Sequence, residues 1–146
     1  MSNYVAKVKY HPTEQKHTLR RIGEGDWIDL YTQYDVDMQA GDYEEISLGV
    51  SIALPPNFEA LVVPRSSTFK KWGIICVNSV GVIDNAYRGD NDIWKFPALC
   101  LVGKTHIPAG TRIAQFRILR NMPQFDMETV TQLDGRCRGG FGSTGD

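Results

Sequence analysis

The sequence contains few residues of the kinds that bind metal ions or form disulfides. There are three histidines and three cysteines, and the cysteines (Cys76, Cys100 and Cys137) include no CxxC pair. An odd number of scattered cysteines predicts reduced thiols and a cytoplasmic location, and it argues against a zinc site. The histidines are scattered as well. We therefore expect no metal ion held by side chains alone.

Long apolar runs and an excess of charge are also missing. No stretch approaches the roughly 18 consecutive apolar residues of a membrane helix, and MSNYVAKVKYH lacks the apolar core of a signal peptide. The net charge is −1, so there is no general basic field that would gather nucleic acid. The sequence therefore predicts neither a membrane nor a nucleic acid as partner.

The remaining composition is that of one globular domain built from strands. The chain has 146 residues, of which 42% are hydrophobic and 23% charged, and this length suffices for one buried core. Short runs rich in β-branched and aromatic residues predict strands, and Gly, Pro and Asn clusters between them predict turns. The pattern predicts an all-β sandwich, jelly roll or barrel. The runs are 4–10, 45–54, 58–64, 73–77, 92–102 and 112–119.

One short segment, SSTFKKWG (66–73), has the signals of a helix. Ser66 is placed to cap its start and Gly73 to end it. It follows Val62, Val63, Pro64 and Arg65, so an arginine and two hydroxyls stand where a strand turns into a helix. This combination suits an anion such as phosphate. The alternative is a serine that only caps a surface turn beside a solvated arginine.

A second segment, NSVGVIDNAYRGD (78–90), places a carboxylate at the end of an apolar strand. Asp84 follows Gly81–Ile83, and Asn85 and Ala86 form a tight turn before Tyr87. A carboxylate fixed at a strand end suits a general base, and a flat ring three residues later would lie at the same pocket. The alternative is a hairpin in which Asp84 bonds its own backbone.

The C-terminal segment GRCRGGFGSTGD (135–146) combines five glycines with two arginines, a phenylalanine and two hydroxyls. No lysine follows the glycines in the spacing of a phosphate-binding loop. RNA-binding tails carry similar RGGFG segments, but here there is one copy and no basic domain. A mobile segment of this kind could close over a ligand that has phosphates at one end and a base at the other.

Together, PRSS, NSVGVIDNAYRGD, GTRIAQFRI (110–118) and RGGFGSTG (138–145) occur in an order that resembles the homotrimeric all-β dUTPases, particularly those of bacilli and their phages. GDWIDLYT (25–32) resembles the first motif of that family, with Asp29 at its acidic position. The resemblance implies a single-domain, jelly-roll-like β-barrel over residues 1–134 with one short helix. It also implies a flexible C-terminal lid, residues 135–146, that covers a neighbouring subunit's site.

The resemblance also implies a role for each motif residue. Asp84 matches the catalytic aspartate that activates water, and Tyr87 matches the ring that packs against deoxyribose. The uracil would be read by Asn78 and by the backbone of Gly81, Val82, Ile83 and Asp84. Phosphate contacts are implied for Arg65, Ser66, Ser67 and Gln115, and in the lid for Arg136, Ser143 and Thr144. Phe141, with Gly142 beside it, matches the ring that covers the uracil.

The implied reaction is hydrolysis of dUTP to dUMP and pyrophosphate at the α-phosphorus, which keeps uracil out of DNA and supplies dUMP for thymidylate synthesis. Mg²⁺ is the implied cofactor, held by the triphosphate and waters, with Asp29 and Gln115 as candidates to hold those waters. The implied assembly is a cytoplasmic homotrimer, in a bacterial host or encoded by a phage, with sites shared between subunits. Cys137 stands where a glycine is usual after the lid arginine.

Two other functions share this fold. The first is that of the dCTP deaminases, a related family whose reaction needs a glutamate in the strand after the third motif. The corresponding segment here, DIWKF (92–96), has no glutamate, and none occurs between Glu59 and Glu128. A regulator would instead bind nucleotide to control an unidentified protein partner. The presence of Asp84, Tyr87 and the lid favours an enzyme over a regulator.

Overall fold

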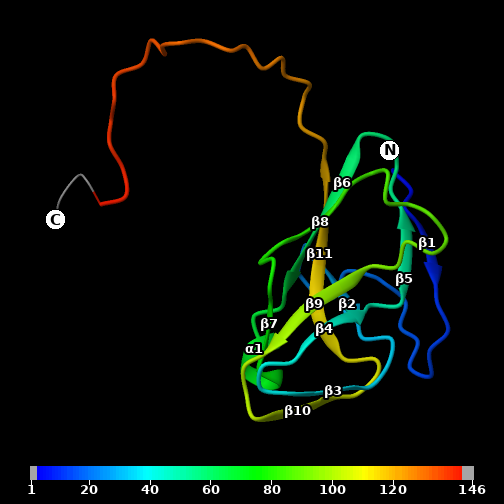
Figure 1. Cartoon of the computed structure of the whole chain (residues 1–146). Coiled ribbons are helices and arrows are strands. Elements are labelled where there is room, and N and C mark those ends of the chain that lie inside the picture. The colour runs from blue at the N-terminus through cyan, green and yellow to red at the C-terminus, as the bar shows by residue number, and fades with distance from the viewer. Residues whose placement is uncertain (1–2, 143–146) are drawn as a thin grey trace.

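The computed structural model describes residues 3–142, and within them strands predominate (Figure 1). One helix of five residues lies between the sixth and seventh strands. The all-β prediction is confirmed. The elements are β1 (Lys7–Tyr10), β2 (Ile28–Tyr31), β3 (Val36–Gln39), β4 (Tyr43–Ser47), β5 (Val50–Ala53), β6 (Phe58–Pro64), α1 (Thr68–Trp72), β7 (Ile74–Cys76), β8 (Gly81–Ile83), β9 (Lys95–Cys100), β10 (Lys104–Ile107) and β11 (Arg112–Arg120).

The strands form four antiparallel sheets within the described residues. The largest has the order β2-β11-β6-β8, a second has the order β4-β9-β7, and the pairs β1-β5 and β10-β3 complete the set. The jelly-roll-like prediction agrees with this arrangement, in which the strands of residues 3–142 form separate sheets and not one closed barrel. The jelly-roll arrangement arises instead from sheets that pack their apolar faces on a common core.

That core is one cluster of buried side chains drawn from all four sheets. Trp94, Phe96 and Leu30 are fully buried, and Trp94 meets Phe116 edge to face with ring centroids 5.1 Å apart. Burying each large apolar side chain contributes roughly 1.5–3 kcal/mol. The core therefore fixes the positions of the sheets, and with them the quoted sequence motifs at the ends of the strands.

The predicted run 45–54 is divided into two strands. Its five apolar residues (Ile46, Leu48, Val50, Ile52 and Leu54) are all buried as their alternation predicts. However, β4 ends at Ser47 and β5 begins at Val50, and Gly49 between them has a φ of 68°. This left-handed conformation, which favours glycine, sends the chain from the β4-β9-β7 sheet to the β1-β5 pair.

The helix prediction is correct at its end and wrong at its start. Gly73 ends α1 with a φ of 67°, and its N–H donates to the carbonyl of Phe69. The N-cap residue is Ser67 rather than Ser66, and it makes no side-chain cap hydrogen bond. The buried Thr68 holds this turn instead: its Oγ1 accepts from the N–H of Arg65 (2.9 Å) and donates to the carbonyl of Ile113 (2.7 Å).

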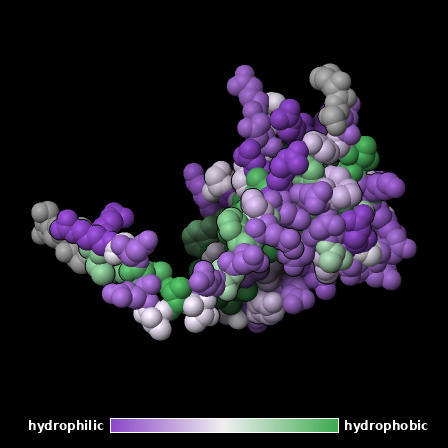
Figure 2. Space-filling model, turned by 90° about the horizontal axis from the view of Figure 1, so that it is seen from above, coloured by the Kyte–Doolittle hydropathy of each residue, from purple (hydrophilic) through white to green (hydrophobic). Residues whose placement is uncertain are grey.

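The C-terminal tail leaves the end of β11 and extends away from the sheets (Figure 1). Every residue from Asn121 to Gly142 is exposed, and these residues contain no helix or strand. Figure 2 shows hydrophobic side chains along this arm, well separated from the body of the molecule. They are Met122, Phe125, Met127, Val130, Leu133 and Phe141.

Candidate functional site

Asp84 lies directly after β8, an edge strand that pairs antiparallel with β6. Its side chain is exposed, and within residues 3–142 no hydrogen bond or ion pair engages its carboxylate. The N–H of Tyr87 donates to the carbonyl of Asp84 (3.0 Å), which closes the predicted tight turn. The alternative in which the Asp84 side chain bonds its own backbone is not observed. The carboxylate is thus positioned by the main chain and open to a ligand.

Two neighbouring residues fix this turn. The Nδ2 group of Asn85 donates to the carbonyls of Pro55 (2.8 Å) and Phe58 (2.9 Å). The Arg88 guanidinium donates to Asn85 Oδ1 (2.9 Å) and to the carbonyl of Leu54 (3.0 Å). The turn after Asp84 is therefore tied to the loop between β5 and β6. From the sequence, Asn85 was assigned only to the turn and Arg88 was given no role, although both lie in the quoted motif.

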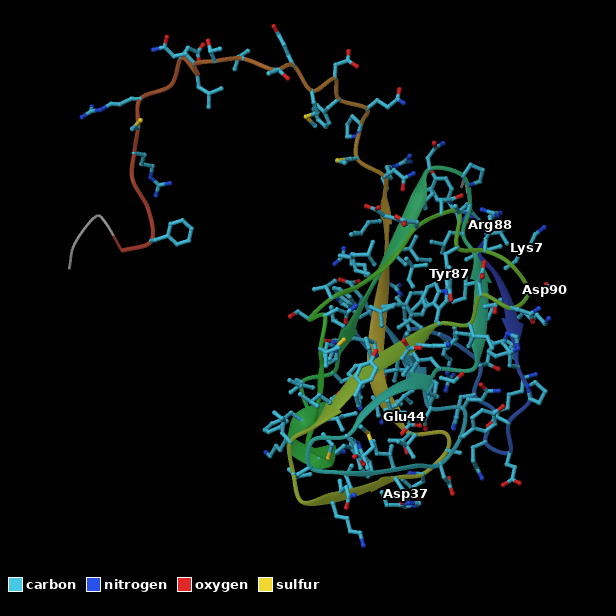
Figure 3. The ribbon with its side chains drawn as sticks, in the orientation of Figure 1. Lys7, Asp37, Glu44, Tyr87, Arg88 and Asp90 are labelled. Carbon is cyan, nitrogen blue, oxygen red and sulfur yellow. The ribbon has the colours of Figure 1, made fainter. Side chains whose placement is uncertain are left out.

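Tyr87 lies at the surface beside the same turn (Figure 3). Its side chain is 39% exposed, and its hydroxyl donates to the carbonyl of Ile93 (3.0 Å). This hydrogen bond anchors the far end of the ring. One face of a fixed ring can therefore meet a flat or saturated ligand group.

The other end of the hairpin carries Asn78. The Cys76 Sγ donates to Asn78 Oδ1 at 2.9 Å, and burial raises the pKa of this thiol, which keeps it protonated. This contact leaves the Asn78 Nδ2 group to donate to a ligand carbonyl. In β8, Gly81 lies close against Val62, because a Cβ at Gly81 would stand 3.2 Å from that residue's Cβ. Val82 is exposed and Ile83 is buried.

A second cluster of polar residues gathers at the opposite end of β6. Asp29 on β2 lies beside Gln115 on β11. Arg65, just after β6, approaches one Asp29 oxygen through Nε (3.1 Å), and Arg112 approaches the other (3.1 Å). The Asp29 side chain is 15% exposed. Both guanidinium groups are therefore held in place by one carboxylate.

This cluster contains most of the residues predicted for the phosphates. Gln115 donates from Nε2 to the carbonyl of Pro64 (3.2 Å), the residue before Arg65. Ser66 is exposed and Ser67 half-buried at the start of α1. Arg112 was not singled out from the sequence, although it lies within the quoted GTRIAQFRI segment. Its ion pair with Asp29 gives it the same environment as Arg65.

The two groups of residues do not meet within one chain. Ala60 pairs with Ile83, which precedes Asp84, whereas Arg65 and Ser66 follow Pro64 at the other end of β6. At about 3.3 Å per strand residue, this places Asp84 roughly 15–20 Å from Arg65. Figures 1 and 3 show this separation, with Tyr87 and Arg88 near one end of β6 and α1 at the other.

The tail residues predicted for the lid also lie apart from both groups. Arg136, Phe141 and Gly142 are exposed on the extended arm. Ser143 and Thr144 lie outside the described residues. The lid assignment therefore stays a prediction for this chain.

The described residues contain no ready-made metal cage. Across residues 3–142 no group of three or more His, Cys, Asp or Glu side chains is placed to hold a metal ion. The acidic residue nearest the predicted phosphate end, Asp29, is already paired with two arginines. Over the same residues, no helix is long and apolar enough to cross a membrane.

The two fixed guanidinium groups suit an anionic ligand, and comparison with known proteins gives the family. The sequence model of the dUTPase family matches residues 6–145. The chain belongs to the dUTPase family. It is 48% identical over 139 residues to the SPbeta prophage-derived deoxyuridine 5'-triphosphate nucleotidohydrolase of Bacillus subtilis (strain 168), covering 95% of this chain and 96% of that protein.

Solved structures agree on the fold. A dUTPase variant of Staphylococcus bacteriophage 80alpha, bound to dUpNHpp, matches with a TM-score of 0.79 and 18% identity over 97% of this chain and 99% of that one. A variant of the dUTPase from phage phi11 of S. aureus, described with a structural Mg(II) ion, matches with a TM-score of 0.73 and 15% identity. It covers 90% of this chain and 99% of the phage protein.

Proposed function

We propose that this chain hydrolyses dUTP to dUMP and pyrophosphate, with Asp84 as the general base. Membership of the dUTPase family supports the reaction. The observation that carries the assignment of Asp84 is its exposed carboxylate, held at a strand end by a turn that Asn85 and Arg88 fix. A carboxylate in this position can accept the proton of a water molecule that attacks the α-phosphorus.

The nucleoside would bind along the β8 hairpin. The Asn78 Nδ2 group and the backbone of Gly81–Ile83 would read the edge of the uracil, since the Asn78 oxygen is occupied by Cys76. The Tyr87 ring, anchored through its hydroxyl, would pack against deoxyribose and leave no room for a 2′-hydroxyl. Selection against UTP would follow from this contact.

The triphosphate would bind at the arginine cluster. Arg65 is oriented by Asp29, and the hydroxyls of Ser66 and Ser67 lie beside it at the start of α1. Ser66 would donate to the oxygen that bridges the α- and β-phosphates, where negative charge develops as pyrophosphate leaves. Gln115 would hold a neighbouring phosphate oxygen or a water molecule.

The donor chemistry fits an Mg²⁺ ion that arrives with the triphosphate. Asp29 and Gln115 could hold the waters of such an ion, which would itself bind mainly through substrate oxygens. When bound, the ion would neutralise phosphate charge and orient the phosphate chain. Arg65 and Ser66 would act on the same phosphate chain.

The separation of Asp84 from Arg65 supports a homotrimer with shared sites. Because one chain holds them roughly 15–20 Å apart, a single dUTP must draw the hairpin and the arginine cluster from different subunits. The exposed arm of residues 121–142 would reach a further site. There Arg136, Ser143 and Thr144 would contact the γ-phosphate, and Phe141 with Gly142 would cover the uracil.

We also infer that the enzyme acts in the cytoplasm of a bacterial host. Cys76 and Cys100 are unpaired and buried in the described structure, and Cys137 is unpaired and exposed. Three unpaired cysteines suit a reducing compartment. The dUMP formed there would be available for thymidylate synthesis.

A nucleotide panel tests the reaction. Pyrophosphate release should be fast with dUTP and Mg²⁺, and slow with dTTP, dCTP and UTP. A chain that released pyrophosphate from all four at similar rates, or from none, would not be a dUTPase. Tail deletion (residues 135–146) should lower kcat/KM strongly and leave the melting temperature without ligand unchanged, since residues 135–142 are all exposed.

The role of Asp84 needs a matched variant. Asp84→Asn keeps the shape of the side chain but cannot accept a proton, so kcat should fall by about 10²–10⁴-fold while dUTP still binds. Asp90→Asn, an exposed carboxylate six positions later in the same loop, is the control and should stay close to wild type. More than about a tenth of wild-type kcat in Asp84→Asn would remove Asp84 from the mechanism.

A further inference from the structure

Two adjoining cavities beside the arginine cluster form a cationic vestibule. The first, of about 450 Å³, lies between the N-terminal loop, α1 and the start of β11. The second, of about 440 Å³, lies under the N-terminal loop, and both are lined by His17 and Tyr31. None of the described residues that line them is an aspartate or a glutamate. Their cations are Lys16, Arg20, Arg65, Lys71 and Arg112.

The wall that carries Lys16 and Arg20 is held against the fold. The His17 ring stacks on Tyr31 with centroids 4.2 Å apart and an interplanar angle of 10°. Lys16 Nζ lies 5.0 Å from the centroid of the Tyr10 ring, whose hydroxyl accepts from the N–H of Leu19 (2.9 Å). These contacts hold the N-terminal loop, and with it Lys16 and Arg20, in place on the surface of the fold.

The charge of the vestibule is a local excess. The whole chain has a net charge of −1. Asp29, which does not line either cavity, is largely buried and paired with two of the lining cations, Arg65 and Arg112. Asp29 offsets one of these two charges, and Arg20 and Lys71 have no side-chain hydrogen bond or ion pair within residues 3–142. A cavity with this balance attracts an anion of several charges.

We propose that the vestibule captures the triphosphate of incoming dUTP and delivers it to Arg65. The inference rests on the proposed function, and it assigns a binding role to three further cations. Lys16 and Arg20 lie outside the motifs that indicate the substrate site, and Lys71 lies in α1, after PRSS. Arg65 and Arg112 line the inner end of the vestibule and also belong to the phosphate cluster. An anion drawn into the vestibule therefore arrives where Ser66 follows Arg65. The outer cations act through charge on the approaching nucleotide.

The test compares the association of a non-hydrolysable dUTP analogue with two variants of the full chain at several salt concentrations. Arg20→Gln/Lys71→Gln removes two charges, and Arg20→Lys/Lys71→Arg exchanges the side chains while keeping both charges. Steering by a charged cleft raises association rates by roughly 10–10³-fold in all. The neutralised variant loses two of the five lining cations, so we expect it to associate about 3–10-fold more slowly than wild type at low salt. The exchanged variant should match wild type.

The difference should vanish as salt rises, because ions screen charges beyond about 10 Å at 0.1 M ionic strength. Binding of uncharged deoxyuridine should be the same in all three proteins. An unchanged rate and salt slope in the neutralised variant would overturn the proposal, as would an equal loss in the exchanged variant. Failure of the proposed function is a separate outcome: wild-type protein would then release no pyrophosphate from dUTP at any salt concentration.

Discussion

Asn85 shows how a residue next to the candidate base can control its position. Its amide makes two donations to main-chain carbonyls and accepts one hydrogen bond from Arg88. Asn85→Ala leaves the carbonyls of Pro55 and Phe58 without this donor, which should lower the free energy of unfolding by about 1–3 kcal/mol. It should also lower kcat more than it raises KM, because Asp84 loses its fixed position.

Denaturant unfolding and steady-state kinetics with dUTP measure both effects. Asn91→Ala, at an exposed asparagine of the same loop, is the matched control. If Asn85→Ala lowered stability but left kcat at the wild-type value, the residue would be structural and Asp84 would be positioned by other contacts.

His106 provides a pH-dependent contact at the far side of the fold from Asp84. Its Nδ1 lies 2.7 Å from Asp37 Oδ1, and this hydrogen bond, with the charge of Asp37 and a smaller contribution from Asp35, raises the pKa of His106. Asp37 is labelled in Figure 3 near β3 and β10. A raised pKa means that the contact stabilises the fold fully below the ordinary pKa of about 6.5. The stabilisation is lost as the pH rises through the folded-state pKa.

The expected result is a pH-dependent difference between wild type and His106→Gln. The variant should melt at a lower temperature than wild type at about pH 5.5, and the two melting temperatures should converge at about pH 9. The effect should be small because both side chains are exposed. A difference that grew with rising pH would contradict the ion pair.

At the level of elements, alternation of apolar residues predicted which side chains are buried more reliably than where strands end. All five apolar residues of 45–54 are buried, yet the run is divided at Gly49. A period of two continues through such a bend, because the pattern records which side faces the core and not which neighbour supplies hydrogen bonds.

The start of α1 illustrates a local choice that tertiary contacts decide. Ser66, Ser67 and Thr68 all have a hydroxyl that can cap a helix, so the sequence alone does not select one. Thr68 holds the turn because its hydroxyl also reaches the carbonyl of Ile113 on β11. That contact spans 45 positions and has no local sequence signal. The same is true of Arg112 and Asp29, which lie 83 positions apart.

Gly73 links α1 to the rest of the fold, and its replacement should be costly. Its φ of 67° is unfavourable for other residues by roughly 1–2 kcal/mol. A Cβ there would also overlap the side chain of Val102. Overpacking of this kind costs roughly 1–3 kcal/mol, so Gly73→Ala should lower the free energy of unfolding by roughly 2–5 kcal/mol, the sum of the two effects.

Gly41 gives a matched comparison for that substitution. Its φ is 88°, but a Cβ at this position would meet nothing within 4 Å. Gly41→Ala should therefore incur only the backbone cost, and urea unfolding should place it between wild type and Gly73→Ala. Equal losses in the two variants would mean that contact with Val102 adds nothing.

At the level of the whole molecule, sequence motifs identified the family, and a single chain holds the predicted site residues in separate places. The motif residues divide into a hairpin at one end of β6, an arginine cluster at the other, and an extended arm. Motif order along the chain carries no information about which subunit supplies each part. The distance along β6 supports the proposal that the hairpin and the arginine cluster of one site come from different subunits, since a strand is too stiff to bring its two ends together.

A mixture of two inactive chains tests this arrangement. One chain carries Asp84→Asn and the other lacks residues 135–146, and they are co-expressed with different affinity tags so that mixed trimers can be purified. If hairpin and lid come from different subunits, each mixed trimer contains one site with an intact Asp84 and an intact tail. The purified mixed trimers should then have about a third of wild-type activity, and the unfractionated mixture from random assembly in equal amounts about a quarter, because three-quarters of its trimers are mixed.

Controls distinguish activity that arises from shared sites from residual activity of the parent chains. Each parent chain alone should be nearly inactive, and a chain that carries both changes should add nothing when mixed with either parent. If hairpin and lid of one site came from the same chain, no mixture would regain activity. Light scattering that found an active monomer would contradict the shared site directly, because Asp84 and Arg65 would then have to meet across the length of β6 in a single chain.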